Sequence, residues 1–274
     1  MSVSHRSGRN VRIAALGLLT LGVALAVYLL PPLVQDPAYH QFADRRTIVG
    51  LSNGLNVWSN LAFVAVGVRG MVCLARQACK SANSFPIDVG FWPYGVFFAS
   101  IALIGPGSAY YHLAPDNARL VWDRLPMAIS FAALVAIMIA ERVSPKLGLW
   151  SLLPLVGLGV GSVIYWRLSA FWGQENLWPY VAVQFYGLTL VLLFGCCFPP
   201  RYSHGYYFLI ALGLYGVAKL AEHFDGAILH ASQAVSGHTL KHLLAALAVY
   251  AVLRMLERRR PLALGGTEPN SPSL

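Results

Sequence analysis

Eight apolar stretches, each about long enough to cross a lipid bilayer, dominate this chain. A transmembrane helix needs about 20 apolar residues, because it rises about 1.5 Å per residue through a hydrocarbon core roughly 30 Å thick. Backbone polar groups find no water inside that core, so spanning segments form helices or closed barrels. The pattern predicts an all-α integral membrane protein with eight spans, at residues 12–31, 56–76, 89–113, 120–140, 149–166, 177–197, 206–223 and 237–255.

Composition supports this class and excludes others. Hydrophobic residues make up 57% of the 274 residues and charged residues only 11%, whereas a soluble domain is roughly a quarter charged. The net charge of +9 comes from basic residues gathered at the two ends and in short loops, without the interleaved aromatic residues of a nucleic-acid site. We therefore expect no nucleic-acid partner, and no protein partner can be inferred from the sequence.

Basic residues also predict the orientation. They precede the first span, in residues 1–11, and follow the last, in residues 256–274, and cytoplasmic segments are enriched in Lys and Arg. Both ends are therefore expected in the cytoplasm. The first stretch is interpreted as a retained helix, because Leu-Leu-Pro-Pro-Leu-Val follows it in place of a signal-peptide cleavage site. Residues 12–255 then form one transmembrane domain, and the Gly-, Ser- and Pro-rich tail is expected to be disordered.

Three histidines stand at the ends of predicted spans. His112 ends the third span, and His238 and His242 begin the last. Their four-residue spacing puts His238 and His242 on one helix face, and the predicted orientation places all three at one depth in the outer half of the membrane. Three imidazole nitrogens leave one position of a tetrahedral Zn²⁺ open, as a hydrolase requires. The set therefore predicts a zinc site.

Two further side chains are expected beside the histidines. Ser108 lies one turn from His112 on the same face, and Asp123 begins the next span. A carboxylate in a membrane helix is costly and tends to be functional, so Asp123 is the candidate general base. The alternatives are a Ser hydroxyl bonded to its own helix, and Asp123 as a cap or an ion-pair partner of Arg119 or Arg124. The histidines alone could also be polar packing residues, a haem pair or a transporter site.

A second polar cluster ends the seventh span. Lys219 and Glu222 are three residues apart and are expected to pair, while His223 and Asp225 are expected at the mouth of the site. The tryptophans lie near span ends and are interpreted as interfacial anchors. They are Trp58, Trp92, Trp122, Trp150, Trp166, Trp172 and Trp178.

Four stretches resemble one family, the alkaline ceramidases. They are residues 56–61, 108–112, 123–130 and 236–242. The alkaline ceramidases belong to a superfamily of seven-helix membrane hydrolases that includes the adiponectin-type receptors. The resemblance implies a seven-helix core over residues 53–255, preceded by one additional N-terminal helix. This added helix and the basic ends indicate a bacterial-type member, located in the inner membrane.

The resemblance also implies a chemistry. Zn²⁺ on the three histidines, with Asp123 activating a water and Ser108 holding the oxyanion, would cleave the N-acyl amide of ceramide or a ceramide-like lipid to a fatty acid and a sphingoid base. The family carries a calcium site before its first core helix. Here two arginines follow Asp44, and Asn53 stands where a glutamate is expected, so calcium is doubtful.

Two other functions stay open. One is a seven-helix receptor or signalling scaffold with a structural zinc. The other is a metal or proton transporter, which would need ionisable residues on a path across the membrane, whereas here they gather at one face.

Overall fold

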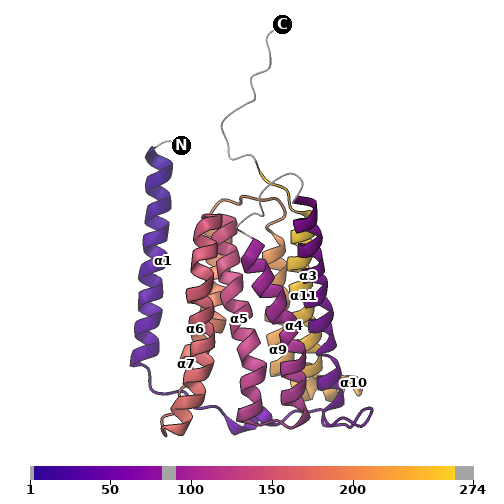
Figure 1. Ribbon diagram of the computed structural model, residues 1–274. Helices are drawn as coiled ribbons and strands as arrows, with labels where there is room; N and C mark the ends of the chain where they lie inside the picture. The colour runs from indigo at the N-terminus through magenta and orange to yellow at the C-terminus, as the bar shows by residue number, and fades with distance from the viewer. Residues whose placement is uncertain (1–2, 82–90, 263–274) are drawn as a thin grey trace.

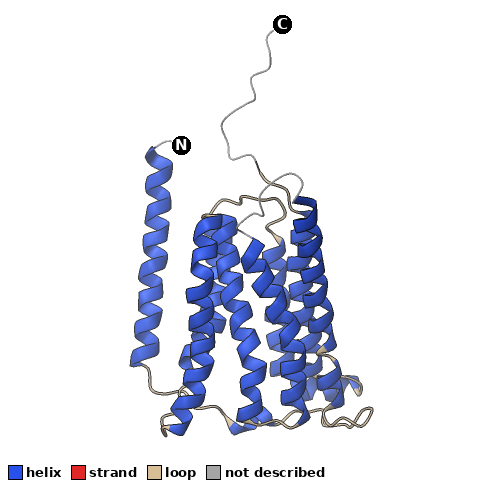
Figure 2. Ribbon diagram, in the orientation of Figure 1, coloured by secondary structure: helices blue, strands red, loops and turns tan. Residues whose placement is uncertain are grey.

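The computed structural model describes residues 3–81 and 91–262, and within them every regular element is helical (Figure 1 and Figure 2). The elements are α1 (Val3–Leu29), η1 (Pro37–His40), α2 (Gly54–Trp58), α3 (Leu61–Ser81), α4 (Phe91–Leu113), α5 (Asn117–Arg142), α6 (Pro145–Phe171), α7 (Trp178–Val181), η2 (Ala182–Tyr186), α8 (Gly187–Cys197), α9 (Tyr207–His223), α10 (Asp225–Ser232) and α11 (Gly237–Arg258).

Seven helical segments among the described residues are long and apolar enough to cross a membrane, and α1 belongs to one of them. The predicted all-α membrane fold is therefore confirmed, and the protein is multi-pass. Helix α9 forms at the predicted stretch 206–223, and its 17 residues match the shortest spans, which have about 17.

Helix boundaries differ from the apolar stretches for local reasons. Helix α6 has 27 residues, whereas the apolar stretch covers 149–166. It begins at the N-cap Ser144, followed by Pro145 in the first turn, where proline is well tolerated. Helix α1 begins within the basic stretch 1–11. In the predicted tail, α11 continues to Arg258, and residues 263–274 lie outside the described part of the chain.

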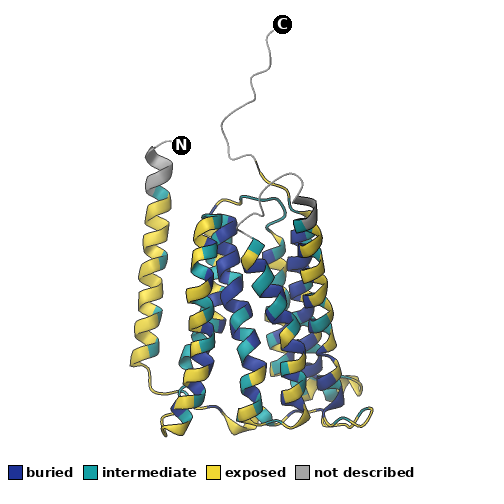
Figure 3. Cartoon of the chain, viewed as in Figure 1, coloured by how far each residue is buried: buried dark blue, intermediate teal, exposed yellow. Residues whose placement is uncertain are grey.

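Six helical segments form a ring around the interior of the bundle. Helix α3 packs on α4, α4 on α5, α5 on α8, α8 on α9, α9 on α11, and α11 on α3. Helix α6 packs on α5 and contributes no residue to the interior cavity described below. Helix α1 contacts the bundle at η2 and is exposed along most of its length (Figure 3).

The two ends of the bundle carry different elements. Helix α1 starts and α11 finishes at one end, whereas α4 finishes and α5 and α11 start at the other (Figure 1). We call the second the histidine end, because His112 lies near the end of α4 and His238 near the start of α11. The antiparallel path of the chain therefore brings segments more than 100 residues apart to one place.

Candidate metal centre and adjoining cavity

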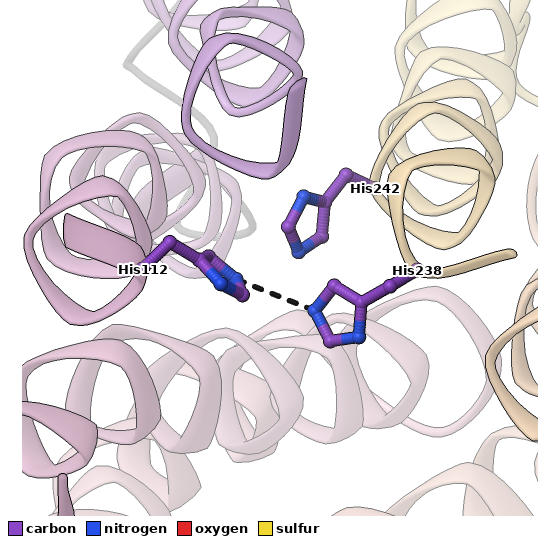
Figure 4. A group of neighbouring side chains, drawn as sticks. All are labelled: His112, His238 and His242. Carbon is purple, nitrogen blue, oxygen red and sulfur yellow. Dashed lines mark hydrogen bonds between the residues drawn. The ribbon is translucent and has the colours of Figure 1, made fainter. Parts of the chain in front are cut away.

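The three predicted histidines lie together at the histidine end. His112, His238 and His242 are buried, with exposed fractions of 1%, 5% and 3%. Their ring centroids are 4.8–5.0 Å apart, and the rings turn toward one another from two helices (Figure 4). One nitrogen from each ring lies within 4.8 Å of the others, so the group could hold a metal ion.

Hydrogen bonds determine which nitrogen of His242 is available. The Nδ1 atom lies 2.8 Å from the Ser59 hydroxyl, and that hydroxyl donates its own hydrogen to the Asn56 carbonyl at 3.1 Å. The serine oxygen therefore accepts the Nδ1 proton, which leaves the Nε2 lone pair for a ligand. The Nε2 atoms of His112 and His238 are 3.3 Å apart.

The Asn-rich segment at residues 53–60 joins the two histidine-bearing helices. Asn53 donates to the carbonyl of His112 at 2.8 Å, and the side-chain oxygen of Asn56 accepts from the Thr239 hydroxyl at 2.8 Å. Helix α2 ends within this segment and α3 begins just after it. The segment thus holds α4 and α11 beside each other at the level of the histidines.

Asp225 anchors the start of α11. Its carboxylate accepts the backbone N–H of His238 at 2.7 Å and that of Ala43 at 2.9 Å, and a negative charge at a helix start is favourable. Gly237 allows this approach, because an added Cβ would lie 2.0 Å from the Ala221 carbonyl oxygen. Asp225, which was expected at the site mouth, therefore binds the backbone N–H of His238 with its side chain.

Ser108 and Asp123 face each other where α4 and α5 touch. An added Cβ at Gly107 would lie 2.3 Å from the Trp122 carbonyl oxygen, which Pro126 leaves without its helical donor. The missing side chain lets the helices approach at this level, where Ser108 and Asp123 both line the cavity described below. Ser108 and Asp123 are both buried.

The structural alternatives for Asp123 find no support. Asp116 is the N-cap of α5 and accepts the backbone N–H of Arg119 at 2.7 Å. Arg124 donates to Gln35 instead. Within residues 3–81 and 91–262, Asp123 forms no ion pair, so the carboxylate is left available to the cavity that it lines.

A cavity of about 250 Å³ extends from the histidines into the bundle. His242, Ser108, Asp123 and Lys241 line its polar end. Along α11 the lining continues from His242 to Val252, a distance of about 15 Å at 1.5 Å per residue. The far walls are apolar, and include Phe97, Ile101, Leu134, Val191, Phe208 and Val249. A lining that is polar at one end and apolar elsewhere suits an amphiphile with its polar group at the histidine end.

Phe42 covers the opposite side of the histidine group. Its ring centroid is 4.6 Å from that of His112 and 4.6 Å from that of His238, and the side chain is buried. Of the three histidines, only His242 lines the cavity. The group therefore opens to the cavity on the His242 side and is closed by Phe42 on the other.

Asp44 and Asn53, which stand where the resembled family has its calcium site, bind other partners. Asp44 accepts the Nε of Arg46 at 2.9 Å on one oxygen and the Nη2 at 2.7 Å on the other. The Arg46 guanidinium holds the pKa of the Asp44 carboxyl below its usual range. The Asn53 side chain donates a hydrogen bond to the backbone carbonyl of His112. An arginine therefore already neutralises the carboxylate that a calcium ion would need.

The remaining predicted residues have mixed outcomes. The Lys219–Glu222 pair is confirmed, and Lys241 joins it at 2.8 Å. His223 is exposed and does not line the cavity. The anchor interpretation of Trp166 is wrong, because its side chain is 1% exposed and donates to Glu175.

Sequence reasoning missed several side chains around the site. Ser59 belongs to a stretch that carries the family resemblance, but no spacing in the sequence predicts its contact with His242, because the two residues are 183 positions apart. Lys241 and Arg124 also line the cavity. Each is a charged residue inside a predicted apolar span, which is costly in a membrane and could have marked both as candidate functional residues.

Comparisons with known proteins identify no relative. No family model matches the chain, and neither a curated protein nor a solved structure does.

Proposed function

We propose that the protein is a zinc-dependent membrane amidase that cleaves the N-acyl amide bond of ceramide or a ceramide-like lipid. One observation carries the proposal: a buried three-histidine group opens through His242 onto a cavity with a polar end and apolar walls, which Ser108 and Asp123 also line. The reaction adds water across the amide and releases a fatty acid and an amine, which is a sphingoid base for ceramide.

The donor set fits Zn²⁺. With Zn–N distances of about 2.0–2.1 Å, a tetrahedral ion separates its nitrogen ligands by about 3.3 Å. The Nε2 atoms of His112 and His238 are 3.3 Å apart, and one nitrogen from each of the three rings lies within 4.8 Å of the others. Imidazole nitrogens suit zinc better than calcium or magnesium. Three protein ligands leave a coordination position open, which is typical of catalytic and not of structural zinc sites.

Bound Zn²⁺ would acidify a water and polarise the amide carbonyl. Asp123 takes the proton of the attacking water and later delivers it to the departing amine nitrogen, as a general base and then a general acid. The Ser108 hydroxyl donates to the carbonyl oxygen as negative charge develops there. The apolar walls hold the acyl chain and exclude bulk water.

The basic residues at both ends of the chain support an orientation for this chemistry. With those ends in the cytoplasm, the histidine end lies in the outer half of a bacterial inner membrane. A lipid of that leaflet then reaches the cavity with its amide at the level of the histidines. Accessibility labelling of a cysteine introduced at His230, an exposed position of α10, tests this orientation.

A direct assay tests the proposal. Fatty acid release from a panel of N-acyl lipids, together with bound metal, is measured for the purified protein and for Asp123→Asn. We expect zinc in both proteins and release that falls by about 10²- to 10⁴-fold in the variant, the usual contribution of a general base. Zinc without release from any lipid would contradict the amidase and favour the receptor or scaffold.

A further inference from the structure

Arg124 is a buried cation that the amidase chemistry does not use. Its side chain is 4% exposed, and it lines the same cavity as Asp123 and His242. Within the described residues it forms no ion pair with a carboxylate. A buried arginine without a counter-ion in a membrane helix is costly and tends to have a function.

The surroundings of Arg124 stabilise the cation but leave hydrogen-bonding capacity unused. The guanidinium carbon lies 4.3 Å from the ring centre of Trp166, 4.9 Å from that of Tyr180 and 5.6 Å from that of Tyr39, and such rings favour a cation. One Nη2 hydrogen bond goes to the Gln35 side chain. The Nη1 atom is buried and has no hydrogen-bond partner within the described residues.

The polar end of the cavity carries an excess of positive charge. Glu222 is neutralised on one oxygen by Lys241 and on the other by Lys219. Against Arg124 and these two lysines stand only Glu222 and Asp123 among the charged lining residues. This end would therefore attract an anion even before a metal ion adds its own charge.

We infer that Arg124, with Tyr39, Trp166 and Tyr180 around it, binds an anionic group carried by the lipid beside its amide. A guanidinium matches the paired oxygens of a carboxylate or phosphate. The substrate class is then N-acyl lipids with an anionic head, such as N-acyl amino acids or phosphorylated N-acyl amines, in preference to neutral ones. This inference rests on the proposed amidase function.

A matched pair of ligands tests the inference. N-lauroylglycine and N-lauroylethanolamine share the acyl chain and amide, and differ by a carboxylate in place of a hydroxymethyl group. Binding is measured as the ligand-dependent shift of the unfolding temperature of the full chain in non-ionic detergent, and hydrolysis as kcat/KM. We expect the wild-type protein to favour N-lauroylglycine by about 10- to 100-fold, as a charged hydrogen bond allows.

Variants assign the preference to the guanidinium. Arg124→Gln is expected to bring the preference close to one, and Arg124→Lys to retain part of it, because lysine keeps the charge without the planar fork. Arg167→Gln is the control, since Arg167 also stacks on an aromatic ring, at 4.3 Å from that of Phe171, but does not line the cavity. The control is expected to keep the full preference.

The outcomes separate this inference from the amidase. Equal binding of the two ligands by the wild-type protein would overturn the inference even if both ligands are hydrolysed. This measurement does not depend on whether any variant folds. An Arg124-dependent preference without hydrolysis would support the subsite and contradict the amidase. Inorganic phosphate alone, producing the same Arg124-dependent stabilisation, would show a free-anion site and overturn the assignment to a lipid head.

Discussion

Both ends of the bundle bury polar side chains, but among the described residues only the histidine end leaves buried polar atoms without a hydrogen-bond partner. Where α11 finishes, Tyr94 donates to Glu141 at 2.8 Å, Arg259 pairs with Glu141, and the Arg259 guanidinium lies 5.0 Å from the Tyr94 ring centre. At the histidine end, three buried atoms lack a hydrogen-bond partner, and the described residues contain no others. They are Asn60 Oδ1, His112 Nδ1 and Arg124 Nη1.

This difference separates a structural cluster from a candidate site. A buried polar atom without a partner costs about 1–3 kcal/mol, so a chain that only had to fold would pair or replace it. The Glu141–Arg259 cluster meets that requirement and closes the end of α11 onto α5. Of the three atoms at the histidine end, Arg124 Nη1 belongs to a residue that lines the cavity, where a ligand could reach it. The following predictions test this contrast, from the largest expected effect to the smallest.

Removing one histidine should abolish metal binding. His238→Ala is expected to lower zinc affinity by more than the roughly 100-fold that loss of an outer partner can cost, because it removes a direct ligand. Zinc titration of the purified variant measures the change. His230→Ala, an exposed histidine of α10, should bind zinc like the wild-type protein. Equal affinity for the two variants would show that the metal lies elsewhere.

Breaking the paired cluster should affect stability and not metal binding. Glu141→Gln leaves the Arg259 charge without its carboxylate and is expected to cost about 3 kcal/mol of unfolding free energy. Denaturant unfolding in detergent measures it. Glu257→Gln, at a more exposed pair of the same end, should cost under about 1 kcal/mol. Loss of zinc from Glu141→Gln at temperatures where the protein stays folded would contradict the separation between a structural cluster at this end and a metal site at the histidine end.

Gly107→Ala should separate α4 from α5 between Ser108 and Asp123. The new methyl group would meet the Trp122 carbonyl oxygen, and such overpacking costs about 2 kcal/mol. We expect lower stability together with a lower kcat, since the serine and carboxylate move apart. Gly95→Ala on the same helix meets no atom within 4 Å and should change neither property. A fully active, stable Gly107→Ala would refute the close contact.

Ser59→Ala should weaken the metal site without destroying it. The variant loses the acceptor that fixes the proton on His242, and outer partners of this kind contribute about tenfold or more to metal affinity. The measurement is zinc competition against a chelator. Ser162→Ala is the matched control, because that buried hydroxyl bonds only a carbonyl of its own helix. A zinc affinity of Ser59→Ala equal to that of Ser162→Ala would show that Ser59 does not support the metal site.

Hydropathy and spacing predicted the helices and the three histidines well, because a span must be long and apolar and a four-residue spacing must share a face. They could not show which partner a side chain meets across the bundle. Asp116, not Asp123, caps α5, and Trp166 lies inside the protein against Arg124. The position of Trp166 depends on how neighbouring helices are rotated, which a single helix pattern leaves open. The Asp116 cap is instead a local contact, because its side chain accepts the Arg119 N–H in the first turn of α5.

X-ray absorption at the zinc edge of the purified protein tests the central claim most directly. The account predicts about one zinc per chain, with three imidazole nitrogens and one oxygen at about 2.0–2.1 Å. His238→Ala should lose this spectrum. A protein without zinc, or a zinc held by four protein ligands or by sulfur, would contradict an open three-histidine site.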